Sequence, residues 1–337
     1  MTALKLGLAL GSGAARGWAH IGVIRRLEEI GLRPQVVTGA SIGSLVGAAY
    51  ASGQLTVLEE WIAKLRWLDV LTMFDTTLGR GGFIAGNKLM STISGLLEDH
   101  PIESLPIGFG AVATDLQTGG EVWLRQGSML DAVRASSGLP GLFVPVQRDG
   151  RWLIDGGVVN PVPVSLCHAL GADLVIAVNL NTDGLDVHRR EREERPAPSA
   201  TASAREAERR DEREILERLG DMLGNLLPSG GNAKADKAAQ PSLFDVMAGT
   251  IAIMQDRITR SRMAGEPPVV QINPRLGGMQ ILDFHKAEPA IDEGLRATDR
   301  VAEELDYLRN LLGSVKKDAS IERSAADQDD DVTPTNA

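Results

Sequence analysis

The stretch that decides the fold is Val36-Val37-Thr38-Gly39-Ala40-Ser41-Ile42-Gly43-Ser44-Leu45. Its β-branched start predicts the end of a buried strand, and the apolar residues after it predict a helix. Residues 39–43, between strand and helix, fit the pattern G-x-S-x-G. In this context the pattern predicts a sharp, strained turn that exposes a nucleophilic serine. A plain turn in which Ser41 is the helix N-cap is the alternative.

A second glycine-rich turn precedes this one. Residues 4–10 predict a first buried strand. This strand ends at a loop with the sequence Gly11-Ser12-Gly13-Ala14-Ala15-Arg16-Gly17, and a helix is predicted after the loop. The order strand, loop, helix, strand predicts a βαβ unit and a parallel sheet. Such a loop directs backbone N–H groups at one point, which suits a dinucleotide pyrophosphate or the oxyanion of an acyl-transfer intermediate. Arg16 stands where the dinucleotide fingerprint requires glycine, so the pattern favours an oxyanion hole.

An activated serine needs a general base, and the sequence offers two arrangements. A Ser-His-Asp triad could use Ser41, Asp155 and either His168 or His285, although both histidines have settings typical of packed or surface residues. Asp155 directly follows the predicted strand 152–154 and precedes two glycines, so its carboxylate could approach the serine unhindered. Burial would raise the pKa of Asp155 toward neutrality, as a general base requires. An ordinary turn is the alternative for this aspartate.

Three motifs, taken in order, resemble those of the patatin-like phospholipases. They are Gly11-x-Gly13-x-x-Arg16-Gly17, Gly39-x-Ser41-x-Gly43 and Asp155-Gly156-Gly157. The resemblance covers roughly residues 5–182, and it points to short bacterial members related to the catalytic domain of neuropathy target esterase.

The resemblance implies both a fold and a chemistry. It implies a three-layer α/β fold with a mostly parallel central sheet flanked by helices. It implies a Ser-Asp dyad, with Ser41 as nucleophile and Asp155 as base. It also implies an oxyanion hole formed by the backbone N–H groups of Gly11, Ser12, Gly13 and Ala14. The implied activity is hydrolysis of acyl esters, usually of phospholipids or lysophospholipids, with no cofactor and no metal.

A different class of function remains open at this point. The first loop could hold a nucleotide or a lipid phosphate in a non-catalytic regulatory module, a role that Arg16 would suit. A binding module, however, has no need of a serine turn and an aspartate together.

Charge and cysteine content exclude some classes of partner and site. The 337 residues carry a formal net charge of −10, and six acids against one base in residues 318–337 supply half of it. The rest is only mildly acidic, so a nucleic-acid partner is not expected. The single cysteine, Cys167, excludes an intramolecular disulfide framework and cysteine-rich zinc sites.

Shifts in composition also divide the chain. We expect a catalytic core in residues 5–182, a charged and partly disordered insertion in 183–240, helices and a strand completing the domain in 241–313, and an acidic disordered tail in 314–337. No signal-peptide pattern opens the chain, and no stretch approaches the roughly 20 apolar residues that span a bilayer. The expected location is the cytoplasm, with peripheral contact at the inner membrane face as a further option.

One predicted helix could make such a membrane contact. It covers residues 242–263 and carries a broad apolar face that includes Phe244, Met247 and Met254, with three arginines near its end. An apolar helical face usually packs on a core, so core packing is the favoured prediction and contact with lipid head groups is the alternative. The expected partner of the whole protein is a lipid or acyl-ester substrate.

Overall fold

The computed structural model describes residues 4–73, 87–140, 143–182 and 243–314. In these residues an eight-stranded sheet has the order β5-β6-β3-β2-β1-β7-β8, and β4 pairs with β3. The strands are β1 (Leu6–Leu10), β2 (Val36–Ala40), β3 (Gly108–Asp115), β4 (Glu121–Leu124), β5 (Val146–Arg148), β6 (Arg151–Asp155), β7 (Leu174–Val178) and β8 (Val270–Ile272). Neighbours along the run from β3 to β8 are parallel, whereas β4, β5 and β6 pair antiparallel. The predicted mostly parallel sheet is confirmed.

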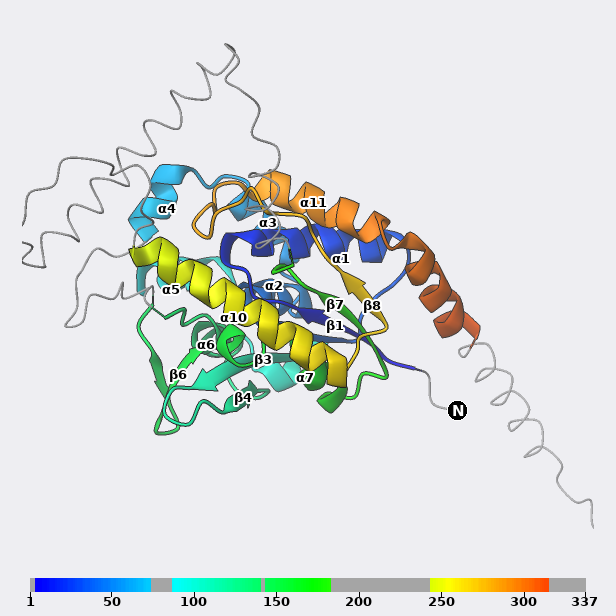
Figure 1. Ribbon diagram of the computed structural model, residues 1–337, viewed down its shortest axis with the longest axis horizontal. Coiled ribbons are helices and arrows are strands. Elements are labelled where there is room, and N and C mark those ends of the chain that lie inside the picture. Colours follow the sequence, from blue (N-terminus) through cyan, green and yellow to red (C-terminus); the bar gives the residue numbers. More distant parts are fainter. Residues whose placement is uncertain (1–3, 74–86, 141–142, 183–242, 315–337) are drawn as a thin grey trace, which may run out of the picture.

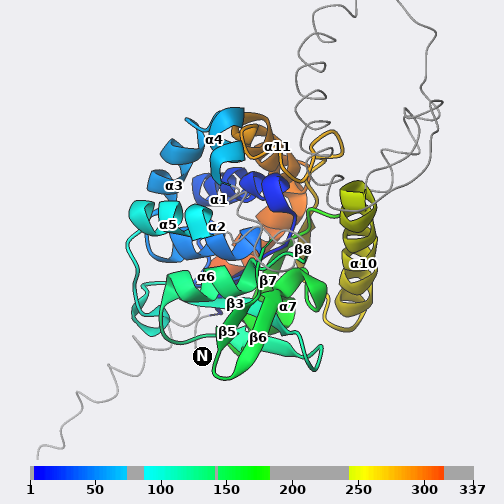
Figure 2. The same cartoon turned by 90° about the vertical axis from the view of Figure 1, so that its left-hand side faces the viewer.

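Helices cover both faces of this sheet (Figures 1 and 2). They are α1 (Ala19–Glu29), α2 (Ile42–Ala51), α3 (Leu55–Ile62), α4 (Trp67–Met73), α5 (Asn87–Leu96), α6 (Met129–Ser136), α7 (Val164–Ala169), α10 (Leu243–Gly265) and α11 (Ala287–Asp299). Short 3-10 helices are η1 (Ala14–Trp18), η2 (Ile102–Ser104) and η3 (Gly156–Val158). This arrangement confirms the α/β fold with a sheet flanked by helices.

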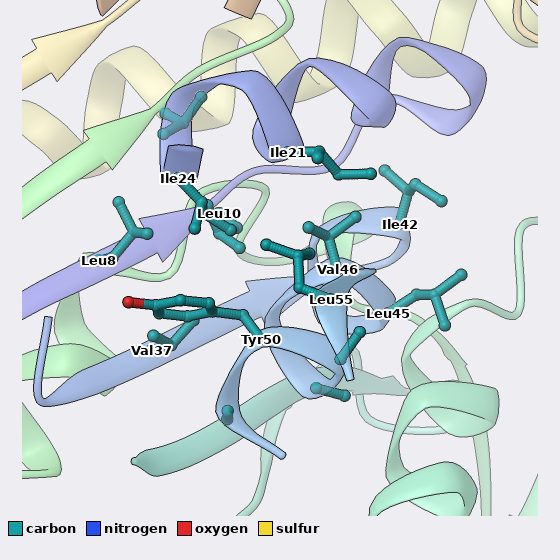
Figure 3. Packing of buried hydrophobic residues seen from close by; sticks show 14 of the residues in the cluster. Leu8, Leu10, Ile21, Ile24, Val37, Ile42, Leu45, Val46, Tyr50 and Leu55 are labelled. Atoms are coloured by element: carbon teal, nitrogen blue, oxygen red, sulfur yellow. The ribbon is translucent and has the colours of Figure 1, made fainter. Parts of the chain in front are cut away.

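The central strands β1, β2, β3 and β7 are buried on both faces, and the sheet separates two hydrophobic cores. Along β1, Leu8 and Leu10 join the larger core with α1 and α2, whereas Ala9 joins a smaller core with α7. This division follows from the period of two in a strand. Figure 3 shows Leu8 and Leu10 of the larger core beside Ile21 and Ile24 of α1. The elements around Ser41 are therefore held by packed side chains.

The segment after residue 242 belongs to this same sheet and core. Strand β8 lies beside β7, and α11 crosses α1 closely. A methyl group on Gly22 of α1 would collide with the Ile291 carbonyl, and one on Gly294 of α11 would collide with the Ala19 carbonyl. Two glycines therefore let the two helix backbones touch.

Several boundaries differ from the sequence-based expectation. Residues 55–71 carry apolar residues at helical spacing throughout, which predicts one helix, but the structure divides them into α3 and α4. Residues 287–312 have the spacing of one long helix as well, but α11 ends at Asp299 and the chain is helical again from residue 302. The predicted insertion at 183–240 and nearly all of the predicted tail at 314–337 lie outside the described residues.

Helix α10 corrects a prediction about packing. Its apolar residues were expected to face the core, yet Met247 and Met254 are 37% and 49% exposed, while Gln255, Asp256 and Thr259 are buried. The polar side chains face inward because α10 packs on the loop that follows Asp155, which presents polar backbone groups. No described helix has both the length and the apolar character needed to cross a bilayer.

Candidate active site

The turn between β2 and α2 holds Ser41 in a strained backbone conformation, with φ 55° and ψ −125°. A methyl group on Gly39 would collide with the backbone of Gly43, and one on Gly43 would collide with the Leu10 carbonyl. The two glycines therefore allow β2, α2 and the end of β1 to meet around the serine. The Ser41 side chain makes no helix-capping hydrogen bond, so the N-cap alternative is not supported.

Two further serines fix this turn. The Ser41 N–H donates to Ser136 Oγ at 2.9 Å, and Ser44 Oγ donates to the Ser41 carbonyl at 2.6 Å. Both bonds use backbone atoms of Ser41, which leaves its hydroxyl group available to other partners.

Strand β3 brings Asp155 to the serine. Ala40 pairs with Val112 of β3, and Asp155 at the end of β6 pairs with Ala113, the next residue of β3. Ser41, which follows Ala40, and Asp155 therefore lie at the same point of the sheet, although they are far apart in sequence.

Burial controls the charge of Asp155. Its side chain is fully buried, and desolvation raises the pKa of the carboxyl group to about 6, against the lowering effects of the Ser41 hydroxyl and the Gly157 N–H. The Gly157 N–H donates to Oδ1 at 2.7 Å, whereas no described residue completes good hydrogen-bond geometry at Oδ2. The Ser41 hydroxyl group is nevertheless close enough to lower the pKa of this carboxyl group. A carboxylate with this pKa can accept a proton near neutral pH.

The two glycines after Asp155 are needed for close approach. A methyl group on Gly156 would collide with the Val112 carbonyl. One on Gly157 would lie 2.5 Å from Gln255 Nε2 and 2.8 Å from Ser12 Cβ. The loop after Asp155 is therefore sandwiched between β3, the first glycine-rich loop and α10.

The first loop lies against the serine turn, but only part of it is free to bind an oxyanion. The Gly11 N–H donates to the Val178 carbonyl at 3.0 Å, and the Ser12 N–H donates to the Pro161 carbonyl at 2.8 Å. The prediction of four available N–H groups is corrected, because the fold uses these two. The N–H groups of Gly13 and Ala14 have no hydrogen-bond acceptor among the described residues. Ala14 also has a positive φ of 50°, which marks backbone strain at this point.

Buried side chains brace this loop from behind. Arg16 donates to the Gly13 carbonyl at 3.3 Å and to Asn181 Oδ1 at 3.2 Å. His20 Nε2 lies 2.8 Å from the Gly11 carbonyl oxygen, and burial lowers the pKa of His20 to about 4, so the neutral ring donates this bond. A methyl group on Gly17 would collide with Ile42, which holds the loop against α2. Arg16 is thus used inside the fold, which does not favour the phosphate-binding alternative.

A cavity of about 80 Å³ opens beside Ser41. Ala14 and Ser41 lie in its wall, and most of the remaining surface comes from apolar side chains of α2, α3, α4, α5 and α6. Examples are Leu45, Val70 and Ile93. Such a lining suits a hydrocarbon chain and offers little to a charged or sugar-like ligand.

The histidine alternatives are not assembled around the aspartate. His168 is exposed and its Nδ1 lies 2.9 Å from the Ala172 carbonyl oxygen, whereas His285 packs against Trp67 with ring centroids 5.4 Å apart. Neither histidine is among the groups that interact with Asp155. Within the described part of the chain, no group of three or more His, Cys, Asp and Glu side chains is placed to hold a metal ion.

Two residues that shape the site, Ser136 and Gln255, were given no role from the sequence. Ser136 lies in the stretch Ser136-Ser137-Gly138-Leu139-Pro140, whose Gly138 carbonyl also accepts from the Asp155 N–H at 3.0 Å. That run of small residues was the available signal for Ser136. For Gln255 no signal existed, because a single glutamine on a distant helix is not a recognisable pattern.

Comparison with known proteins agrees with this geometry. A family model described as patatin-like phospholipase matches residues 8–168, which include both glycine-rich turns and Asp155. An uncharacterized NTE family protein from Mycobacterium bovis is 32% identical over 336 residues, and the match covers 86% of this chain and 89% of that protein. Neuropathy target esterase sws from Drosophila melanogaster is 35% identical over 190 residues, which cover 54% of this chain and 13% of that protein.

A solved structure gives a weaker likeness. VipD from Legionella pneumophila aligns with a TM-score of 0.39 at 13% identity, covering 95% of this chain and 80% of that chain. A likeness at this level supports no conclusion about the site.

Proposed function

Since the chain belongs to the patatin-like phospholipase family, we propose that it is a serine hydrolase of carboxylic acyl esters, with Ser41 as nucleophile and Asp155 as general base. One observation carries the proposal. A strained, glycine-flanked serine faces a buried carboxyl group whose pKa is raised to about 6, and an apolar cavity opens beside the serine.

The reaction would run in two halves. Asp155 takes the proton of the Ser41 hydroxyl group as Oγ attacks the ester carbonyl carbon. The carbonyl oxygen becomes an oxyanion that accepts from the Gly13 and Ala14 N–H groups. The C–O bond to the alcohol then breaks, and the departing alkoxide takes the proton from Asp155, which leaves an acyl-serine. Asp155 next removes a proton from water as the water oxygen attacks the acyl carbon. The bond between that carbon and Ser41 Oγ then breaks, and Asp155 returns the proton to Oγ, which releases the fatty acid and restores the Ser41 hydroxyl group.

The cavity supports one class of substrate. Its lining is apolar almost throughout, so the acyl part of the ester would be a hydrocarbon chain. Phospholipids and lysophospholipids combine such a chain with an ester at a polar head, and the family name is consistent with this class. We therefore propose a phospholipid or lysophospholipid as the substrate.

Covalent labelling tests the nucleophile, and turnover tests the base. A fluorophosphonate probe should label the wild type and fail to label Ser41→Ala, with exposed Ser104→Ala as the matched control. Hydrolysis of a short-chain 4-nitrophenyl ester should be lost in Ser41→Ala and reduced about 10²-fold or more in Asp155→Asn, the scale of general-base catalysis. Full activity in either variant would overturn the dyad.

A lipid panel then separates the substrate classes. Release of fatty acid from phospholipid, lysophospholipid and neutral glyceride should be compared in wild type and Ser41→Ala. Activity restricted to short soluble esters would refute the proposed lipid substrate while leaving the dyad intact.

A further inference from the structure

Helix α10 exposes four of its large apolar side chains and buries three of its polar ones, while Arg257 and Arg260 are exposed and Met263 packs against the smaller core. Val246, Met247, Ile253 and Met254 are exposed, and Gln255, Asp256 and Thr259 are buried. A helix on a globular protein normally does the reverse. Exposed apolar residues grouped on one element indicate contact with a partner or a membrane.

The buried side of α10 explains why the helix cannot simply rotate. Arg262 Nε donates to the Val159 carbonyl at 2.9 Å, and Arg262 Nη2 pairs with Glu121 at 2.9 Å. Gln255 packs on Gly157, two residues after Asp155. Rotation that buried Met254 would break these contacts with the loop that carries the aspartate. The apolar side is therefore fixed outward.

A further exposed apolar side chain lies on a helix that contributes to the cavity lining without itself lining the cavity. Leu68 is 64% exposed, and it belongs to α4, whose Val70 and Met73 line the cavity beside Ser41. Figure 1 shows α4 and the start of α10 at the same end of the molecule, and Figure 2 views that end with α4 at the top and α10 at the right. Exposed apolar residues thus lie on two helices at the end where the parallel strands lead to Ser41.

Positive side chains accompany these apolar ones. Lys64 and Arg66 precede α4, Lys88 lies in the first turn of α5, and Arg257 lies on α10, all exposed. Arg66 pairs with Asp69 at 3.3 Å, so three of the four cations have no such pairing within the described residues. Exposed apolar residues mixed with cations match a bilayer whose head groups are anionic.

We propose that α4 and the first half of α10 form a docking surface for an anionic phospholipid bilayer. Docking would orient the end of the molecule that contains the cavity toward the bilayer, so that an acyl chain could pass from the lipid into the cavity beside Ser41. We choose a lipid bilayer over a protein partner because of the proposed function. The apolar cavity that would hold the acyl chain is lined in part by α4, so it lies next to this surface.

Vesicle flotation with the full chain tests this surface. Wild type should float with vesicles of phosphatidylcholine plus phosphatidylglycerol, bind phosphatidylcholine alone more weakly, and lose binding as salt is raised. Leu68→Asp and Met247→Asp should each weaken partition about tenfold, because each removes a buried apolar contact with the bilayer. Tyr307→Asp is the matched control, since Tyr307 is 73% exposed on the C-terminal helical turns after α11.

Control measurements and vesicle binding together decide the outcome. The variants should keep the wild-type circular dichroism spectrum and rate on a soluble 4-nitrophenyl ester, because neither side chain lines the cavity. Absence of wild-type binding, or full binding by the Leu68→Asp/Met247→Asp double variant, would overturn the proposal. So would self-association that the double variant abolishes without any vesicle binding. Wild type that floats with vesicles but is never labelled by fluorophosphonate would keep the surface and refute the hydrolase.

Discussion

At the residue scale, two unfavourable conformations meet at one point. Ser41 and Ala14 both have positive φ, which costs about 1–3 kcal/mol per residue, and Asp155 is a fully buried carboxyl group. Neighbouring groups hold each of these residues in place. Glycines pack around Ser41, the side chains of Arg16 and His20 bind the loop that contains Ala14, and the Gly157 N–H donates to Asp155. Strain and buried charge gathered in this way are typical of a catalytic site.

The raised pKa of Asp155 predicts the pH dependence of the reaction. A general base must be unprotonated, and the pKa of this carboxyl group is raised to about 6. We expect kcat/KM for a soluble ester to fall below about pH 6 and to reach a plateau above it. Rates measured from pH 3 to 8.5 check this, and a midpoint near pH 4 would show that Asp155 titrates as an ordinary carboxyl group.

The same burial predicts an effect on stability. A carboxyl group whose pKa is about 6 in the fold and 3.8 when unfolded stabilises the protein below pH 3.8 and loses that contribution as pH rises through 6. Asp155→Asn should therefore be more stable than wild type at pH 8, on the order of 2–3 kcal/mol, and nearly equal at pH 4. Urea unfolding at both pH values measures this, with exposed Asp292→Asn as control. Equal destabilisation at both pH values would contradict it.

Sequence alone could select Ser41 and Asp155 as candidate site residues, because each lies in a short local motif. It could not show which N–H groups of the first loop remain free. That choice depends on Val178 and Pro161, which take up the Gly11 and Ser12 N–H groups from distant parts of the chain.

At the element scale, the crossing of α1 and α11 depends on two glycines. Their Cα atoms stand where any side chain would meet the backbone of the other helix, so Gly22→Ala or Gly294→Ala must push the helices apart. We expect each variant to lower the free energy of unfolding by about 1–3 kcal/mol, as overpacking does. Chemical denaturation measures the loss.

Gly249→Ala is the matched control for this crossing. It lies inside α10 with open space around it, and alanine there should stabilise the helix by about 0.5–1 kcal/mol. Wild-type stability in Gly22→Ala would show that the helices can separate at little cost.

Secondary structure followed from local patterns more readily than packing did. The strands around Ser41 were predictable because uninterrupted apolar runs fit a sheet buried on both faces. The orientation of α10 was not, because helical periodicity shows that two faces differ without showing what each face contacts. Here the contact is the loop after Asp155, whose Val159 carbonyl requires a donor such as Arg262.

At the scale of the whole molecule, the site is closed by parts that lie on either side of residues 183–242. The Ala15 N–H donates to the Ile281 carbonyl at 3.2 Å, and Trp18 Nε1 donates to the Phe284 carbonyl at 3.0 Å. Phe284 also lines the cavity. The first loop and the cavity beside Ser41 therefore depend on a part of the chain that follows the residues matched by the family model.

This dependence predicts that the first half of the chain does not fold alone. A protein ending at residue 182 would lack β8 beside β7, α11 against α1, and the carbonyls that hold η1. Its exposed apolar surface on α1 and β7 should make it aggregate, with no cooperative thermal unfolding and no fluorophosphonate labelling. A chain ending at residue 314 keeps every described contact and should behave as wild type. If the chain ending at 182 unfolds cooperatively and is labelled at Ser41, the later helices and strand are an addition to a core that is complete without them.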